Sequence, residues 1–101
     1  MNITVSGRHM EVTPALKQYA EQKATKLEKY YDLIHKIDVI FDAGKDSTAV
    51  EMIATADHQN TFVAKHAQGD AYACIDGCMH KLERQLHEHK DKFRNRKHSG
   101  E

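Results

Sequence analysis

Residues 37–67 have the sequence IDVIFDAGKDSTAVEMIATADHQNTFVAKHA, in which two clusters of turn-forming residues separate three short segments. The segments are rich in β-branched residues or alternate between apolar and polar ones, and both patterns predict strands. The turns at 43–47 and 57–60 are too short to hold a crossover helix, so consecutive strands should pair antiparallel. The predicted strands of this meander are Ile37–Phe41, Val50–Thr55 and Thr61–Ala67.

One further strand and two helices are predicted outside the meander. Asn2–Ser6 alternates apolar and polar residues, which is typical of a strand. The pair Thr13-Pro14 indicates a helix start, because threonine caps a helix and proline suits its first position, and this helix should run to about Tyr31. Asp70 can cap a second helix, whose apolar residues recur at helical spacing as far as Phe93.

The predicted fold class is therefore α+β, with the element order β-α-β-β-β-α. The first crossover is long enough to make the first two strands parallel, so the four-stranded sheet should be mixed. Each helix must bury its apolar stripe, which predicts that both helices pack on one face of the sheet. We expect a single domain over residues 1–93, followed by a basic and flexible C-terminal tail over residues 94–101.

The composition indicates a soluble globular protein. Hydrophobic residues make up 40% of the chain and charged residues 30%, a balance that excludes a disordered protein. The longest apolar run, Val39–Phe41, is far shorter than the roughly 20 residues of a membrane span, and the N-terminal residues lead us to expect no secretory signal. Because no phosphate-binding glycine loop or evident catalytic arrangement is present, we expect no enzymatic activity, catalytic residue, cofactor, metal or small-molecule substrate.

Charge is unevenly distributed along the chain, although 15 basic and 15 acidic residues give no net charge. Residues 8–36 hold six Lys or Arg and four Asp or Glu, and residues 77–98 hold seven and three. Residues 37–76 hold only two Lys or Arg and seven Asp or Glu, so this middle segment is acidic. Two helices on one sheet face would bring both basic segments to one surface, where they can bind the phosphates of an RNA. The candidate contacts are Lys23, Lys26, Lys29, Lys81, Arg84, Lys90, Lys92 and Arg94.

Other interpretations of the same residues stay open. The basic rows can be a solvated face, and the tyrosines at 19, 30, 31 and 72 are expected in the core rather than as stacking platforms. Cys74 and Cys78 share a helix face and can bind a metal with distant histidines, but two buried thiols are the simpler expectation. A protein-docking module would use the acidic middle and the open sheet face, on which Ile40, Ile53 and Val63 can form an apolar patch.

Three stretches resemble a known family. They are Ser6-Gly7-Arg8 with Val12–Leu16, Lys23–Tyr31, and Asp70–Asp76 continuing into Lys81–Leu86 and Lys90–Lys92. The chain resembles the short bacterial ribosome hibernation promoting factors and the related ribosome-associated translation inhibitors from Met1 to about Phe93. The third stretch is the most specific.

The resemblance implies a fold similar to double-stranded RNA-binding domains. It also implies binding to 16S rRNA of the small ribosomal subunit, in the channel used by mRNA and tRNAs. Occupying that channel would inhibit translation in the cytoplasm of stationary or stressed cells and stabilise inactive ribosomes, with a second hibernation factor as a possible partner. On this basis the rRNA-contacting residues are Lys23, Lys26, Lys81, Arg84, Lys90 and Lys92, with Lys29 and Arg94 as extensions. Glu88 stands where the family commonly has a basic residue, which reduces the positive charge of the surface.

Overall fold

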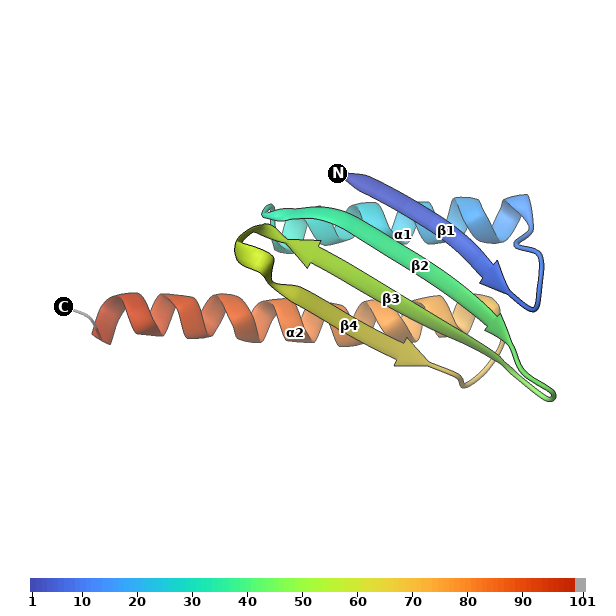
Figure 1. Ribbon diagram of the computed structural model, residues 1–101. Coiled ribbons are helices and arrows are strands. Elements are labelled where there is room, and N and C mark those ends of the chain that lie inside the picture. The colour runs from blue at the N-terminus through green and yellow to red at the C-terminus, as the bar shows by residue number, and fades with distance from the viewer. Residues whose placement is uncertain (100–101) are drawn as a thin grey trace.

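The computed structural model describes the backbone of residues 1–99 and, within it, the side chains of residues 1–58 and 60–90. The element order is the predicted β-α-β-β-β-α (Figure 1). The elements are β1 (Asn2–Arg8), α1 (Pro14–Tyr30), β2 (Ile34–Ala43), β3 (Thr48–Ala56), the short 3₁₀ helix η1 (Asp57–Gln59), β4 (Thr61–His66) and α2 (Ala71–Ser99).

The strands form one mixed sheet in the order β1-β2-β3-β4. β1 pairs parallel with β2, placing Val5 opposite Val39, and the remaining neighbours pair antiparallel. Both helices cover the same face of this sheet, with α1 packed on β1 and β2 and α2 packed on β3 and β4 (Figure 1). The predicted fold class is therefore confirmed, and no helix of residues 1–99 covers the opposite face of the sheet.

Both helices begin at the predicted caps. Thr13 Oγ1 accepts a 3.2 Å hydrogen bond from the Leu16 amide at the start of α1, and Pro14 occupies the first turn. Asp70 Oδ1 accepts a 2.8 Å hydrogen bond from the Ala73 amide at the start of α2. These caps fix where each helix begins, while the apolar stripe of each helix decides which face meets the sheet.

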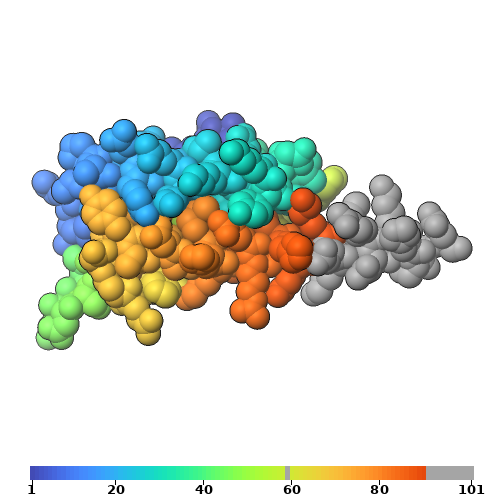
Figure 2. Space-filling view, turned by 180° about the vertical axis from the view of Figure 1, so that it is seen from behind, coloured from blue at the N-terminus to red at the C-terminus, as the bar shows by residue number. Residues whose placement is uncertain are grey.

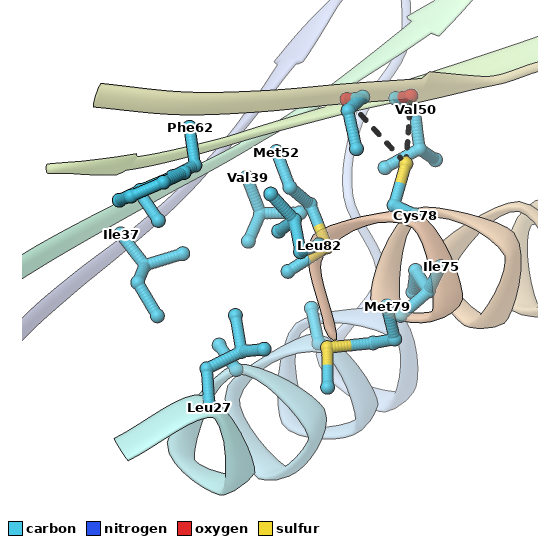
Figure 3. Close-up of a cluster of buried hydrophobic side chains, with 14 of the residues drawn as sticks. Leu27, Ile37, Val39, Val50, Met52, Phe62, Ile75, Cys78, Met79 and Leu82 are labelled. Atoms are coloured by element: carbon cyan, nitrogen blue, oxygen red, sulfur yellow. Dashed lines mark hydrogen bonds between the residues drawn. The ribbon is translucent and has the colours of Figure 1, made fainter. Parts of the chain in front are cut away.

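The core lies between the sheet and the helices (Figure 3). β3 shows the predicted alternation, burying Val50 and Met52 while intervening residues stay partly exposed. Opposite them, Leu82 of α2 and Leu27 of α1 are fully buried. Each such side chain contributes about 1.5–3 kcal/mol through burial, so the core holds both helices firmly against one sheet face.

Several boundaries differ from the predicted ones. β1 continues to Arg8, and β2 begins at Ile34 because that side chain is buried in the core. α2 continues through Ser99 rather than ending near Phe93, so most of the predicted tail is helical. Residues 94–99 contain no proline or glycine, and their Arg and Lys residues have a high helix propensity. The helix therefore continues here although no apolar pattern marks it. No helix in the described part of the chain is long and apolar enough to span a membrane.

Candidate nucleic-acid interface

The helix layer carries the excess positive charge of the fold. α1 contains four lysines and two glutamates, and α2 contains seven Lys or Arg and four Asp or Glu. The four strands together carry three basic and three acidic residues. By sequence the two helices therefore hold a surplus of five positive charges, two on α1 and three on residues 91–99 of α2, whose side chains lie outside the described residues. The strands are neutral, so the helices rather than the sheet favour an anionic partner.

The two helices lie side by side and run in the same direction (Figures 1 and 2). Tyr19 meets Asp76 near the two helix starts, and Tyr31 meets His89 farther along the pair, with 3.3 Å between the Tyr31 hydroxyl and His89 Nε2. Besides Lys81, which is described below, four of the predicted cations are exposed on this layer. They are Lys26, Lys29, Arg84 and Lys90.

A set of four side chains, here called the seam cluster, joins the helices near their N-terminal ends. The Tyr19 hydroxyl donates a 2.7 Å hydrogen bond to Asp76 Oδ1, and Lys23 Nζ lies 3.9 Å from the same oxygen. Lys23 Nζ also lies 5.2 Å from the centre of the Tyr19 ring, and Tyr72 contacts that ring edge to face at 5.1 Å. The pKa of Tyr19 lies above its ordinary value, mainly because of the hydrogen bond to Asp76 and secondly because of burial.

Lys81 departs from the predicted common patch. Its ammonium group donates to the backbone carbonyl of Lys65 on β4, on the side of α2 that faces away from α1. One turn later, Gln85 Nε2 donates a 2.8 Å hydrogen bond to the Val63 carbonyl of the same strand. Lys81 and Gln85 therefore cover carbonyl groups of an edge strand, a position that sequence spacing alone does not reveal.

Carboxylates accompany two of the remaining candidates. Lys23 is near Asp76, as described, and Arg84 Nε lies 3.5 Å from Glu88 Oε1 with both side chains well exposed. Such exposed pairs are weak, worth less than about 1 kcal/mol, so a phosphate can replace Glu88 as the partner of Arg84. Lys92 and Arg94 belong to α2, but their side chains lie outside the described residues.

The tyrosines only partly follow the prediction that they are core residues. Tyr19 and Tyr31 are half-buried, whereas Tyr30 is 43% exposed and Tyr72 is 39% exposed. The prediction is wrong for these last two, because each lies at the border of an apolar stripe rather than on it. The residue that sequence reasoning missed is Asp76, which shares a helix face with Tyr72, four residues earlier; only the fold shows that this face meets α1.

The cysteines form part of the core. Cys74 Sγ lies 3.3 Å from the Thr48 carbonyl oxygen as a donor. Cys78 Sγ lies 3.2 Å from the Val50 carbonyl oxygen, also as a donor (Figure 3). Burial raises the pKa of Cys78 to about 11, which keeps the thiol protonated at neutral pH. Among the described residues, no group of three or more His, Cys, Asp or Glu side chains can hold a metal ion.

The open sheet face gives little support to the protein-docking alternative. Val63 is 46% exposed and pairs with Ile53, which is half-buried, as is Ile40. Charged cross-strand partners interrupt these apolar residues, since Glu51 lies opposite Ile40 and Asp38 lies opposite Ile53. The acidic middle segment is likewise divided between this face, the turns and the seam cluster rather than forming one surface.

Residues 3–94 match the family model described as Sigma 54 modulation protein / S30EA ribosomal protein. The chain belongs to this family. Relatives named ribosome hibernation promoting factor include one from Klebsiella oxytoca, 37% identical over 97 residues, and one from Escherichia coli K12, 36% identical over 95 residues. Each of these alignments covers 93% of this chain and 98% of the relative.

Two solved structures share the fold. A ribosomal subunit interface protein from Coxiella burnetii superposes with a TM-score of 0.83 at 31% identity, covering 90% of this chain and 99% of that one. The N-terminal domain of Protein Y from Thermus thermophilus gives a TM-score of 0.77 at 28% identity, covering 85% and 96% respectively. The family resemblance found in the sequence is thus confirmed over nearly the whole fold.

Proposed function

We propose that this protein is a ribosome hibernation factor that binds 16S rRNA in the mRNA and tRNA channel of the small ribosomal subunit. It inhibits translation by occupying that channel in the cytoplasm, with no chemical reaction, and it stabilises inactive ribosomes. The family membership and the names of the relatives support ribosome binding. The observation that favours the RNA as the direct partner is the concentration of surplus cations on the helix layer, away from a neutral sheet.

The cations of the two helices supply most of the binding free energy in this proposal. Phosphate contacts position a protein on RNA, while the shape of the RNA helix provides much of the specificity. If about six cations each neutralise one phosphate, the logarithm of affinity should fall with the logarithm of salt concentration with a slope of roughly −4 to −5. The six proposed contacts are Lys26, Lys29, Arg84, Lys90, Lys92 and Arg94.

Two further candidates have a conditional part in the proposal. Lys23 must share its charge with Asp76, and Lys81 must leave the Lys65 carbonyl before it can reach a phosphate. Both therefore contribute less than an unpaired cation such as Lys26. A second hibernation factor remains a proposed partner of the bound ribosome.

Co-sedimentation of matched charge-reversal variants with isolated small subunits, across a salt series, tests the proposal. The first variant combines Lys26→Glu with Arg84→Glu on the helix layer. The second combines Lys36→Glu with Lys65→Glu, which makes the same change of net charge at exposed positions of the sheet. We expect the helix variant to lose binding at physiological salt and the sheet variant to retain it. Equal losses in the two variants, or none, would contradict the proposed interface.

A further inference from the structure

Tyr72 is an exposed aromatic ring that is held in a fixed position. Although 39% exposed, it lies edge to face with Tyr19 at a centroid distance of 5.1 Å and an interplanar angle of 78°. Tyr19 is itself fixed by its hydrogen bond to Asp76 and by the ammonium group of Lys23 beside its ring. The ring of Tyr72 is therefore presented to solvent by a rigid support, which lowers the entropy cost of stacking against it.

The charges around this ring favour a nucleobase over a phosphate. Asp76 lies 3.9 Å from Lys23, and the negative charges of Asp70 and Asp76 both raise the pKa of Tyr19. Lys23 is thus paired with Asp76, and the charge of Asp70 also acts at this end of the helix pair, so the two carboxylates offset the attraction of Lys23 for a phosphate. A neutral base meets no such penalty, and its π-face stacks well on tyrosine.

The exposed cations lie beyond the seam cluster along the same surface. Lys26 follows Lys23 by three residues on α1, an advance of about 4.5 Å along the helix axis. A base at Tyr72 thus leaves the adjoining backbone free to run toward Lys26 and the rest of the basic layer.

We propose that Tyr72 is a stacking site for one unpaired nucleobase at the edge of the RNA interface. This inference rests on the proposed function, and it identifies the RNA feature recognised there as a flipped-out or bulged base rather than a continuous duplex. RNA recognition that depends on sequence or local structure commonly uses such unstacked bases. Phosphate contacts elsewhere on the layer supply affinity, and the stacked base supplies selectivity.

Two conservative variants separate stacking from packing. Tyr72→Phe keeps an aromatic face, whereas Tyr72→Leu keeps apolar bulk without one. The probes are a short hairpin RNA with one bulged adenosine and the same hairpin fully paired. We expect Tyr72→Phe to bind both as the wild type does, and Tyr72→Leu to lose about tenfold in affinity for the bulged hairpin alone. Tyr30→Leu, at a similarly exposed tyrosine outside the seam cluster, is the control and should distinguish the two hairpins as the wild type does.

Fluorescence gives a second measurement, because the chain contains no tryptophan. The Tyr72→Trp variant carries a single reporter, whose emission should be quenched by the bulged hairpin and unchanged by heparin, a polyanion without bases. Unchanged emission with the bulged hairpin overturns the inference, as does a Tyr72→Leu variant that loses affinity equally for both hairpins or for neither. A wild-type chain that distinguishes the hairpins but fails to co-sediment with small subunits contradicts the proposed function and leaves the stacking site in place.

Discussion

The Tyr19 hydroxyl on α1 and the Asp76 carboxylate on α2 form a 2.7 Å hydrogen bond across 57 residues of sequence. This bond ties the two helices together at the surface proposed to bind RNA. We expect Tyr19→Phe to lower the free energy of unfolding by about 1 kcal/mol, because the fold loses one charge-assisted hydrogen bond. Urea unfolding measures this loss, and Tyr30→Phe, which removes an exposed hydroxyl, should have no measurable effect. Equal stability of the two variants would show that the bond contributes nothing.

Burial of the Cys78 thiol predicts a loss of stability at high pH. Its pKa in the folded state is about 11, above the ordinary value of 9.0, so the unfolded state releases this proton at lower pH than the folded state does. The associated stability is fully present below pH 9 and is lost as pH rises toward 11, by roughly 2–3 kcal/mol in total. Denaturant unfolding at several pH values should show that the free energy of unfolding falls less with rising pH in Cys78→Ala than in the wild type. Identical declines would mean that the thiol titrates normally in the fold.

Sequence reasoning predicted the fold well because the decisive information is local. The alternation in β3, the cap at Thr13 and the cap at Asp70 each specify an element from a few adjacent residues. The end of α2 was harder to predict, because residues 94–99 continue the helix by propensity without an apolar stripe.

The candidate site was predicted less completely than the fold. The sequence identified both basic helices, but side chains on one helix face do not reveal which neighbour that face meets. Lys81 and Arg84 are three residues apart, yet Lys81 contacts β4 while Arg84 pairs with Glu88. Interactions between elements, including the one at Asp76, depend on how α1 and α2 pack, and no spacing rule contains that information.

The edge strand β4 is covered by α2 side chains, and removing them should expose it. Lys81 and Gln85 donate to the Lys65 and Val63 carbonyls, groups that would otherwise be free to pair with another strand. We expect the double variant Lys81→Met with Gln85→Leu to lose about 1–2 kcal/mol in urea unfolding and to self-associate in sedimentation velocity. Arg84→Met, on an exposed face of the same helix, is the control. A double variant as stable and as monodisperse as that control would show that the two contacts protect nothing.

Glu88 reduces the positive charge of the helix layer and should weaken binding to small subunits. Glu88→Lys removes the carboxylate 3.5 Å from Arg84 Nε and adds a cation one turn farther along the helix. We expect this variant to co-sediment more tightly with small subunits. The slope of log affinity against log salt concentration should become steeper by roughly one to two. Asp46→Lys makes the same charge change in the exposed turn between β2 and β3 and serves as the control. Equal effects of the two substitutions would indicate a response to net charge alone.

Gly77 lies inside α2, where glycine ordinarily costs about 1 kcal/mol relative to alanine. Here the structure reverses that expectation, because a Cβ atom at this position would lie 2.4 Å from the ring of His66 at the end of β4. The His66 ring therefore occupies the space that the side chain of an alanine at position 77 would need. We expect Gly77→Ala to lower the thermal midpoint and to destabilise the fold by about 1–3 kcal/mol, despite its better helix propensity. Adding His66→Ala should restore most of the loss, since the obstructing ring is gone and only the gain in helix propensity remains. A single variant that is more stable than the wild type would show that the His66 ring moves aside without cost.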